Sequence, residues 1–260
     1  QEIKKKIKAK KVGHMGTLDP LASGLLVLAI NRATKFSSYF LESEKSYHVE
    51  VSLGISTDTD DSTGNIISKS NDCPDEVLIM KELYRFEGES FQVPPFYSAL
   101  KHKGKPLYYY ARKGEFISKP ARKIKVTNIE DFKYRNKICS FRIQCSKGTY
   151  IRSIARDLGE RLGCGAHMKS LTRLSQGKFC ISESKEISHL SEDDIINIEK
   201  AFEDLESIII TPEHEKKFIN GVTIPELKQK DNIYRVFSKD NTFIGIGEIK
   251  DSFLNHKQLV

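Results

Sequence analysis

The most informative part of this chain is the run Gly13-His14-Met15-Gly16-Thr17-Leu18-Asp19-Pro20-Leu21-Ala22-Ser23-Gly24-Leu25-Leu26. Pro20 fixes its own φ angle and pushes Asp19 toward an extended conformation, while the glycines allow sharp turns and a close approach to a ligand. The run therefore predicts a tight turn that displays one carboxylate at the mouth of an apolar strand. Its residues alone leave two interpretations open: a reactive Asp19, or an ordinary Asp-Pro turn that leads into a core strand.

The sequence after this run mixes strand and helix signals. Residues 49–53 and 140–145 alternate apolar and polar side chains, which is typical of strands with one buried face. Helices are expected at residues 75–84 and at residues 154–162, where Gly163 follows the last apolar residue. This mixture predicts an α+β fold with a catalytic domain of strands and intervening helices.

The last third of the chain changes character. Nine acidic residues face one lysine between positions 192 and 215, and the apolar positions around them predict an amphipathic helix over residues 195–205. Residues 224–260 then turn to short strand-like runs, which predict a small closed β structure. The acidic face is not expected to touch nucleic-acid phosphates.

Composition excludes several classes of protein. The five cysteines form no C-x-x-C pair, which argues against disulfides and a structural zinc site, and a turn with a buried Cys164 is favoured over a zinc ligand beside His167. Asp58, Asp60 and Asp61 do not fit a calcium loop and predict a capped turn instead. With neither a secretory leader nor a long apolar stretch in sight, we expect a cytoplasmic protein that binds no membrane and no metal.

The positive charge is concentrated in two segments. The net charge is +7, residues 4–11 are mostly lysine, and residues 101–125 carry nine basic side chains against the single acid Glu115, with tyrosines between them. Each segment alone is as well explained by a solvated surface. Together they favour a polyanion with exposed bases as the partner, because aromatic rings among cations stack on bases.

A family resemblance follows from these residues and from later blocks in the same order. Residues 12–36 resemble the signature of the TruB family of tRNA pseudouridine synthases. The further matching blocks are Lys45-Ser46-Tyr47, Thr57-Asp58-Thr59-Asp60 with Gly64, Gln92-Val93-Pro94-Pro95-Phe96-Tyr97-Ser98-Ala99-Leu100-Lys101, Ser146-Lys147-Gly148-Thr149-Tyr150-Ile151-Arg152-Ser153, Gly163-Cys164-Gly165-Ala166-His167, Leu171 and Arg173-Leu174. The resemblance covers residues 12–180.

Two departures from the family pattern stand out. The chain opens at Gln1 and lacks the Lys-Pro-x-Gly-x-Thr-Ser block that the family carries earlier, so we expect it to be incomplete at its N-terminus. Met15 stands where the family more often has a small or polar residue, which leaves Asp19 in place.

The resemblance implies a fold, a reaction and a partner. The fold is a pseudouridine-synthase catalytic domain, with a mixed and largely antiparallel sheet flanked by helices, over residues 1–205, and a small PUA-like β-barrel that binds RNA over residues 206–260. An RNA-clamping insertion occupies about residues 92–125. The activity is cofactor-free isomerisation of uridine to pseudouridine at position 55 in the T arm of tRNA, by a monomer that needs no protein partner.

The resemblance also assigns roles in the reaction. Asp19 is the catalytic residue, Arg152 forms an ion pair with it, and Tyr150 lies against the target base. The residues themselves suggest a strand at 148–152, in which Tyr150 and Arg152 face one cleft while Ile151 faces the core; a surface strand with a solvated arginine is the alternative.

Further roles concern the pocket and the RNA. The resemblance makes Tyr47 the stacking partner of the flipped base and a participant in proton transfer, and Leu171 a wall of the pocket, where the residues alone indicate an ordinary strand tyrosine and a core leucine. His14 is assigned to recognition of the RNA beside the flipped nucleotide. The other residues expected to bind RNA are Lys35, Lys101, Lys103, Lys105, Arg112 and Arg173.

The sequence leaves one other function open and argues against a second. A tRNA-binding folding chaperone, with catalysis secondary or lost, fits the basic segments and the missing N-terminal block. A uridine methyltransferase would need a glycine-rich methyl-donor loop, which the sequence lacks.

Overall fold

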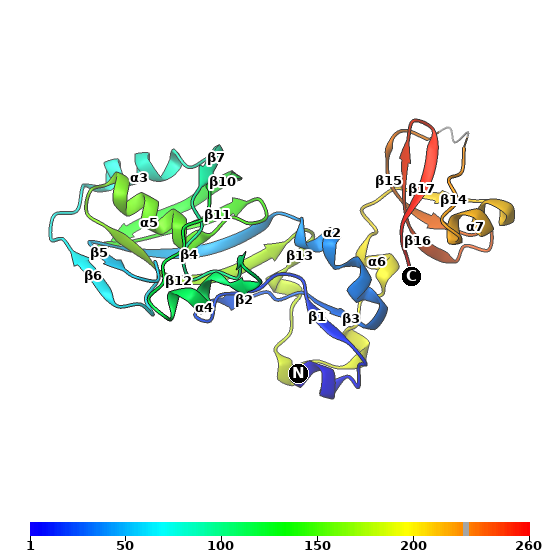
Figure 1. Cartoon of the computed structure of the whole chain (residues 1–260), viewed down its shortest axis with the longest axis horizontal. Coiled ribbons are helices and arrows are strands. Elements are labelled where there is room, and N and C mark those ends of the chain that lie inside the picture. The colour runs from blue at the N-terminus through cyan, green and yellow to red at the C-terminus, as the bar shows by residue number, and fades with distance from the viewer. Residues whose placement is uncertain (226–228) are drawn as a thin grey trace. The chain divides into compact units, whose positions relative to one another are not determined.

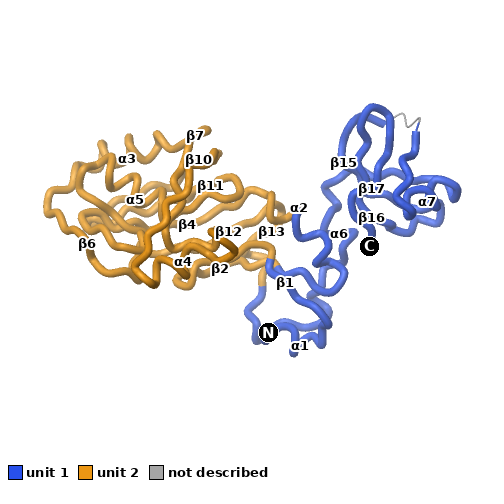
Figure 2. The backbone as a smooth tube through the Cα atoms, viewed as in Figure 1, with its two compact units in different colours: residues 1–14, 28–38, 185–260 blue, residues 15–27, 39–184 orange. Residues whose placement is uncertain are grey.

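A mixed β-sheet dominates one of the two units into which the chain divides (Figure 1). The computed structural model describes residues 1–225 and 229–260. Unit 1 consists of residues 1–14, 28–38 and 185–260, and unit 2 of residues 15–27 and 39–184 (Figure 2). These units do not coincide with the segments 1–205 and 206–260 expected from sequence.

The sheet of unit 2 has seven strands in the order β13-β12-β4-β11-β10-β7, with β2 beside β12. All pairs along this order are antiparallel, and β2 runs parallel to β12. The predicted mixed, largely antiparallel sheet is thus confirmed. The strands are β2 (Ser23–Gly24), β4 (Lys45–Leu53), β7 (Gly88–Gln92), β10 (Arg122–Arg135), β11 (Ile138–Cys145), β12 (Ala166–Gln176) and β13 (Phe179–Cys180).

Alternation of side chains explains the central strands. In β4 every second residue from Lys45 to Leu53 is buried, and in β11 Phe141, Ile143 and Cys145 are buried. Because successive side chains of a strand point to opposite faces, this pattern gives the sheet one apolar face. The strands predicted at 49–53 and 140–145 are therefore confirmed.

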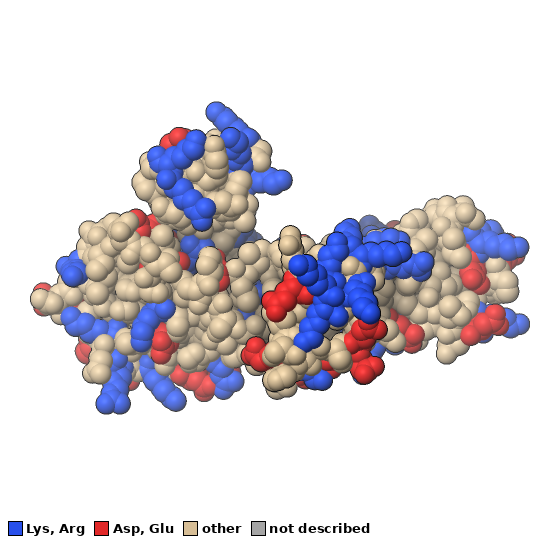
Figure 3. Space-filling model, turned by 90° about the horizontal axis from the view of Figure 1, so that it is seen from below, with Lys and Arg blue, Asp and Glu red and all other residues tan. Residues whose placement is uncertain are grey.

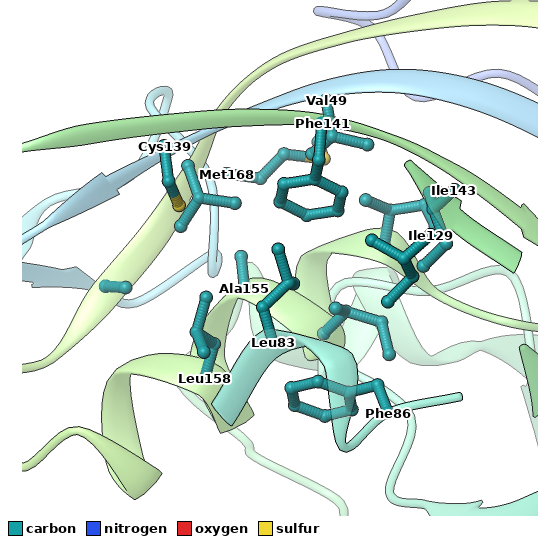
Figure 4. Close-up of a cluster of buried hydrophobic side chains, with 14 of the residues drawn as sticks. Val49, Leu83, Phe86, Ile129, Cys139, Phe141, Ile143, Ala155, Leu158 and Met168 are labelled. Carbon is teal, nitrogen blue, oxygen red and sulfur yellow. The ribbon is translucent and has the colours of Figure 1, made fainter. Parts of the chain in front are cut away.

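Two helices cover that apolar face (Figure 4). Helix α3 (Glu76–Tyr84) begins after Asp75, whose carboxylate accepts a hydrogen bond from the Leu78 N–H at 2.8 Å, and helix α5 (Ile151–Arg161) follows β11. Leu83 of α3 and Leu158 of α5 point toward Phe141 of the sheet. Both helices were predicted. Gly163, with a φ of +68°, directly follows the C-cap residue Leu162 of α5.

The predicted strand at residues 148–152 is wrong. Tyr150 is the extended N-cap of α5, and Ile151 and Arg152 already belong to the helix. The helical pattern of buried residues explains this, since Ile151, Ile154, Ala155 and Leu158 recur at the spacing of one helix face.

Unit 2 also contains short elements outside the seven-stranded sheet. Strands β5 (Ile55–Thr57) and β6 (Ile66–Lys69) pair, and the expected insertion contains the hairpin of β8 (Lys101–His102) and β9 (Lys105–Pro106) followed by α4 (Leu107–Ala111). Lys103 and Gly104 both have positive φ angles, as a two-residue hairpin turn of the primed type requires. One 3-10 turn, η2 (Ile181–Glu183), closes the unit.

Unit 1 contains a small two-stranded ribbon. Strand β1 (Val12–His14) pairs antiparallel with β3 (Leu28–Ile30), and Ile3 of α1 (Glu2–Lys6) and the C-cap residue Ile7 pack against this ribbon. The 3-10 helix η1 (Asn31–Phe36) follows β3, and α2 (Ser37–Leu41) leads from one unit to the other. Along the described part of the chain, none of the helices is both long and apolar enough to span a lipid bilayer.

The predicted acidic helix at 195–205 is wrong. The segment instead contains the 3-10 turns η3 (Ile187–His189) and η4 (Glu192–Asp194) and the one-turn helix α6 (Ile198–Ala201). Local capping explains the difference. Ser191 and Asp194 form the capping box of η4, and the Asn197 side chain accepts a hydrogen bond from the Lys200 N–H, so that α6 begins after it.

The C-terminal strands form an open sheet. Its order is β14-β15-β16-β17, from β14 (Ser207–Ile209), β15 (Asn232–Phe237), β16 (Phe243–Lys250) and β17 (Phe253–Leu259), and α7 (Pro212–Ile219) contributes the buried Phe218 to its core. Within residues 207–225 and 229–260 no pairing closes this sheet, so the expected β-barrel is not found.

Candidate active site

The segment 15–27 forms a loop along one edge of the unit 2 sheet. Its tip is a turn in which the Ala22 N–H donates to the Asp19 carbonyl at 2.9 Å, with Pro20 as the first central residue. Pro favours that place because its φ angle is already suited to it. The predicted tight turn that displays Asp19 is confirmed, and 28% of the Asp19 side chain is exposed.

Asp19 and Arg152 form a two-pronged ion pair. The Nε and Nη2 atoms of Arg152 donate to the two carboxylate oxygens of Asp19 at 2.8 Å each. Arg152 is only 5% exposed, so the pair is screened little by water. Such planar pairing sets the orientation of the carboxylate as well as its charge.

Arg152 is itself held in place by further contacts. Its Nη2 also donates to the Tyr97 carbonyl at 3.0 Å, its Nη1 donates to the Thr59 carbonyl at 3.3 Å, and its Nε lies 3.8 Å from a carboxylate oxygen of the buried Asp61. Asp61 accepts from the Thr63 N–H and from two threonine hydroxyls, which confirms the predicted capped turn. The guanidinium is therefore fixed before any substrate binds.

A second arginine of α5 forms an outer layer. Arg156 lies 3.1 Å from Asp60 and donates to the Val93 carbonyl at 3.0 Å. Burial raises the pKa of Asp60 to about 6, although the Arg156 charge opposes this rise. This layer ties the turn at 58–63 and residue 93 to the helix that carries Arg152.

Tyr47 and Leu171 lie on neighbouring strands of the same face. Tyr47 of β4 is opposite Arg173 of β12, and Leu171 is opposite Val49, so their side chains share the apolar side of the sheet. Burial raises the pKa of Tyr47, and the nearby Asp19 charge raises it further, which keeps the phenol protonated. Both residues are thus close to the Asp19 loop; their roles toward a base stay predictions.

Tyr150 lies at the start of α5, two residues before Arg152. Gln92, which is 2% exposed, accepts from the Tyr150 N–H at 2.8 Å and donates to its carbonyl at 3.0 Å. The Arg122 guanidinium lies 4.5 Å from the centroid of the Tyr150 ring and donates to the Gly148 carbonyl. The tyrosine is held at its backbone by one neighbour and at its ring by another.

The insertion presents cations next to aromatic rings. The Nζ atoms of Lys105 and Lys113 lie 4.4 and 4.6 Å from the centroid of the Tyr109 ring, and their hydrogen bonds and charges lower its pKa. Arg112 lies over Tyr108. Lys101, Lys103 and Lys105 are exposed on the hairpin, as expected for residues that contact phosphates.

Two of the residues expected to bind RNA belong to unit 1. His14 ends β1 and Lys35 lies in η1, and both are exposed. Lysine and arginine side chains gather where α1 and the following turn lie (Figure 3). This second basic surface consists of Lys4, Lys5, Lys6, Lys8, Lys10 and Lys11.

Arg173 differs from the other basic residues. It is 1% exposed, and its guanidinium donates to the carbonyls of Leu25 and Gly16 and to the side chain of Gln176. A buried guanidinium that is already satisfied by its own chain is not placed to contact a phosphate. These contacts do not support the expectation that Arg173 binds RNA.

Sequence reasoning missed several residues that build the site. Asp61, Gln92 and Arg122 support Arg152 and Tyr150, yet the sequence indicates none of these supporting roles. Asp61 is predicted only as part of a capped turn, Gln92 lies in one of the blocks quoted above, and Arg122 belongs to the basic segment 101–125. Their partners are mostly backbone atoms far away in the sequence, and a pattern of side chains does not predict such contacts.

The assembled site can do one kind of chemistry. An oriented carboxylate, a protonated tyrosine and an apolar wall suit nucleophilic or general-base attack on a neutral substrate away from bulk water. Among the described residues no group of three or more His, Cys, Asp or Glu side chains is placed to hold a metal ion.

Comparison with known proteins gives matches along the whole chain. The family models described as "TruB family pseudouridylate synthase (N terminal domain)", "tRNA pseudouridylate synthase B C-terminal domain" and "Pseudouridine synthase II TruB, C-terminal" match residues 4–151, 152–213 and 207–260.

Individual relatives agree with these models. The chain is 42% identical to the tRNA pseudouridine synthase B of Clostridium kluyveri over 96% of this chain and 90% of that one, and 36% identical to that of Thermotoga maritima over 97% and 86%. A chain in the structure of an H/ACA RNP bound to a substrate RNA containing 2′-deoxyuridine is 22% identical, with a TM-score of 0.70 over 99% of this chain and 78% of that one. This last likeness concerns the fold.

Proposed function

Because the chain belongs to the TruB family of pseudouridine synthases, we propose that it isomerises uridine to pseudouridine at position 55 in the T arm of tRNA. The bidentate ion pair between Asp19 and Arg152 carries the proposal. Asp19 occupies the place of the family's catalytic aspartate, and its carboxylate is exposed on one side and oriented on the other.

The reaction needs the protein to supply position and charge. The bond between N1 and C1′ of the ribose breaks, and a bond between C5 and C1′ forms. C5 loses a proton and N1 gains one, so the reaction involves no net oxidation or reduction. The proposal therefore requires no redox cofactor. Asp19 acts on the nucleotide, and Arg152 holds its carboxylate aligned in the partly buried site.

The target uridine must leave its stack before Asp19 can reach it. Flipping a base out of a folded RNA costs a few kcal/mol, and stacking on an aromatic ring returns about 1–3 kcal/mol. Tyr47 and Tyr150 are the rings that the proposal assigns to the base, with Leu171 as the apolar wall. Tyr150 suits this role because Gln92 and Arg122 fix it in advance.

The RNA around the target is proposed to contact the exposed cations. Lys101, Lys103, Lys105 and Arg112 of unit 2 would bind phosphates of the T arm, and His14 and Lys35 of unit 1 would also contact the RNA. The C-terminal sheet is assigned a role in RNA binding in the same way, and the protein is proposed to act as a monomer without a partner protein. The exposed lysines interleaved with tyrosines in the insertion support its assignment to RNA binding.

The test is pseudouridine mapping of an unmodified tRNA transcript with the parent chain and with Asp19→Asn, in the absence of added cofactor. The parent should form pseudouridine at position 55 of the T loop, and Asp19→Asn should form none while binding the tRNA as tightly. Tight binding by both proteins with no product from either would refute the proposed isomerase and favour a tRNA-binding chaperone.

A further inference from the structure

Arg173 is a buried cation that has no carboxylate partner. It lies in β12 with 1% of its surface exposed, and in the described part of the chain it forms no ion pair. Burial lowers its pKa, because removal from water disfavours the charged form. A buried guanidinium without a counter-ion destabilises a fold, so its contacts should account for its presence.

Those contacts lead to both ends of the Asp19 loop. The Nε of Arg173 donates to the Leu25 carbonyl at 2.9 Å, after Asp19, and its Nη2 donates to the Gly16 carbonyl at 3.1 Å, before Asp19. Its Nη1 lies 3.4 Å from the side-chain oxygen of Gln176, whose amide in turn donates to the Met15 carbonyl. One planar group thus spans the loop that carries the catalytic carboxylate.

The loop is shaped to lie against this residue. A Cβ atom on Gly24 would lie 2.4 Å from the Arg173 carbonyl oxygen, and one on Gly16 would lie 3.0 Å from its Nη1. Both glycines have positive φ angles, +138° at Gly16 and +94° at Gly24. The Leu25 N–H also donates to the Arg173 carbonyl at 2.9 Å, so backbone and side chain of Arg173 hold the same residue.

No other side chain would replace this arrangement. Lysine carries one compact charge at the end of a flexible stem and cannot reach two carbonyls in a fixed plane, whereas the guanidinium presents its donors in a rigid fork. Methionine would fill the space and donate nothing. Lysine leaves at least one of the carbonyls of Gly16 and Leu25 without its partner, and methionine leaves both without one.

We propose that Arg173 is a positioning residue for the isomerisation: it fixes the loop of residues 15–25 at both ends so that the Asp19 carboxylate is aligned with Arg152, and it makes no contact with RNA. This inference rests on the proposed function. A catalytic group must be held within a fraction of an ångström of its productive place, and a displacement of about 1 Å can cost on the order of 100-fold in rate.

The test compares Arg173→Lys and Arg173→Met with the parent and with Arg135→Lys, an exposed arginine of β10 outside the insertion. Three quantities are measured: the single-turnover rate of pseudouridine formation with saturating enzyme, the dissociation constant for tRNA, and the melting temperature. We expect both Arg173 variants to lose on the order of 100-fold in rate while their dissociation constants stay close to that of the parent.

Each other result overturns the inference. A weaker affinity with a smaller salt dependence and an unchanged rate would make Arg173 an RNA contact. A lower melting temperature with a parent-like rate below it would make Arg173 a purely structural residue. Should Arg173→Met not fold, Arg173→Lys and Gln176→Leu are measured in its place. The second variant removes the contacts of Gln176 with Met15, Phe40 and the Arg173 Nη1 but keeps those of Arg173 with Gly16 and Leu25. Parent-like rates from both would refute the proposal.

Hydrogen–deuterium exchange separates this inference from the proposed function. In Arg173→Lys the amides of Met15 and Leu25 should exchange faster than in the parent, while those of β4 and β11 should not change, because only the loop has lost its anchor. An inactive parent would refute the proposed function and leave this measurement as the test of the anchoring. Unchanged exchange at both amides would refute the anchoring.

Discussion

At the scale of single residues, Arg152 connects the catalytic carboxylate to the rest of unit 2. Its guanidinium contacts Asp19, Asp61 and two backbone carbonyls. Two carboxylates share one cation, and the shorter contacts go to Asp19. The geometry of Asp19 therefore depends on the planar fork of an arginine rather than on positive charge alone.

Replacing Arg152 with lysine tests this dependence. A lysine keeps the charge but cannot bind both Asp19 oxygens in one plane, so we expect the single-turnover rate to fall on the order of 100-fold with little change in tRNA affinity. Arg161→Lys is the matched control, because Arg161 lies on the same helix over the Phe86 ring and away from Asp19. Equal rates for Arg152→Lys and the parent would contradict the expectation.

Asp60 gives a prediction about pH. Its pKa is raised by burial to about 6, against about 3.9 in an unfolded chain. Between these values the folded chain holds a proton that the unfolded chain releases, so this contribution to stability is present below about pH 4 and is lost as the pH rises through about 6.

The variant Asp60→Asn cannot titrate and should lack this loss. In urea unfolding between pH 4 and pH 7, the parent should become less stable relative to Asp60→Asn as the pH rises, by up to about 3 kcal/mol. Asp72→Asn, at an exposed position, should follow the pH dependence of the parent. A stability difference between the parent and Asp60→Asn that does not vary with pH would refute the assignment.

At the scale of elements, α5 lies unusually close to the start of β12. A Cβ atom on Gly159 would be 2.2 Å from the Ala166 nitrogen and 2.4 Å from the Gly165 carbonyl carbon. A helical glycine is ordinarily less stable than alanine by about 1 kcal/mol. Here the neighbours are backbone atoms that cannot move aside, so the usual preference should be reversed.

We expect Gly159→Ala to destabilise the protein by about 1–3 kcal/mol, the cost of overpacking a core. Gly163→Ala is the control, because a Cβ there meets open space and only the φ of +68° opposes it, at about 1–2 kcal/mol. Urea unfolding compares the two. A Gly159→Ala variant more stable than the parent would mean that α5 and β12 do not pack this closely.

How far sequence predicts these elements depends on where their partners lie. The strands β4 and β11 follow from alternation within a few residues, and α3 follows from its Asp75 cap. The start of α5 was missed because Tyr150 is indeed extended, and the helix begins one residue later. The burial of Arg173 was missed because its partners are carbonyls about 150 residues earlier in the chain.

The same limit applies to the C-terminal part. Apolar spacing over residues 195–205 favours one helix, yet a capping box at Ser191 forms a separate 3-10 turn before this segment and the Asn197 cap starts a one-turn helix within it. The strands after residue 230 were expected, but whether a sheet closes depends on pairings between distant strands, which their individual patterns do not specify.

The insertion hairpin gives a prediction on RNA binding. Replacing its three exposed lysines should weaken tRNA binding and lower the slope of log K against log salt by about 2–3, since each lost phosphate contact accounts for roughly 0.7–0.9. The single-turnover rate at saturation should not change. The triple variant is Lys101→Ala, Lys103→Ala and Lys105→Ala.

A control for the hairpin removes the same charge elsewhere on unit 2. Exposed lysines outside the insertion are replaced together, at Lys69, Lys81 and Lys133. This control should keep the slope of the parent. Equal slopes for the two triple variants would mean that the hairpin has no special part in binding.

At the scale of the whole molecule, the net charge of +7 is distributed unevenly. Basic side chains gather on the insertion and around α1, while residues 192–215 carry nine acidic side chains. Counterion release depends on the phosphates that are contacted rather than on total charge. The acidic segment should therefore have little effect on affinity for tRNA, although it lowers the net charge.

A charge-neutralising variant separates total charge from local charge. Glu186→Gln, Glu192→Gln and Asp193→Asn together raise the net charge from +7 to +10, as removing three acidic residues adds three. Asp194 is kept because it caps η4. If the affinity for tRNA depends on phosphate contacts rather than on total charge, the dissociation constant and its salt slope should change less than about twofold, since none of these positions gains a phosphate contact. An increase in slope as large as the decrease expected for the three hairpin lysines would show that tRNA responds to the total charge, and the assignment of binding to the insertion would be refuted.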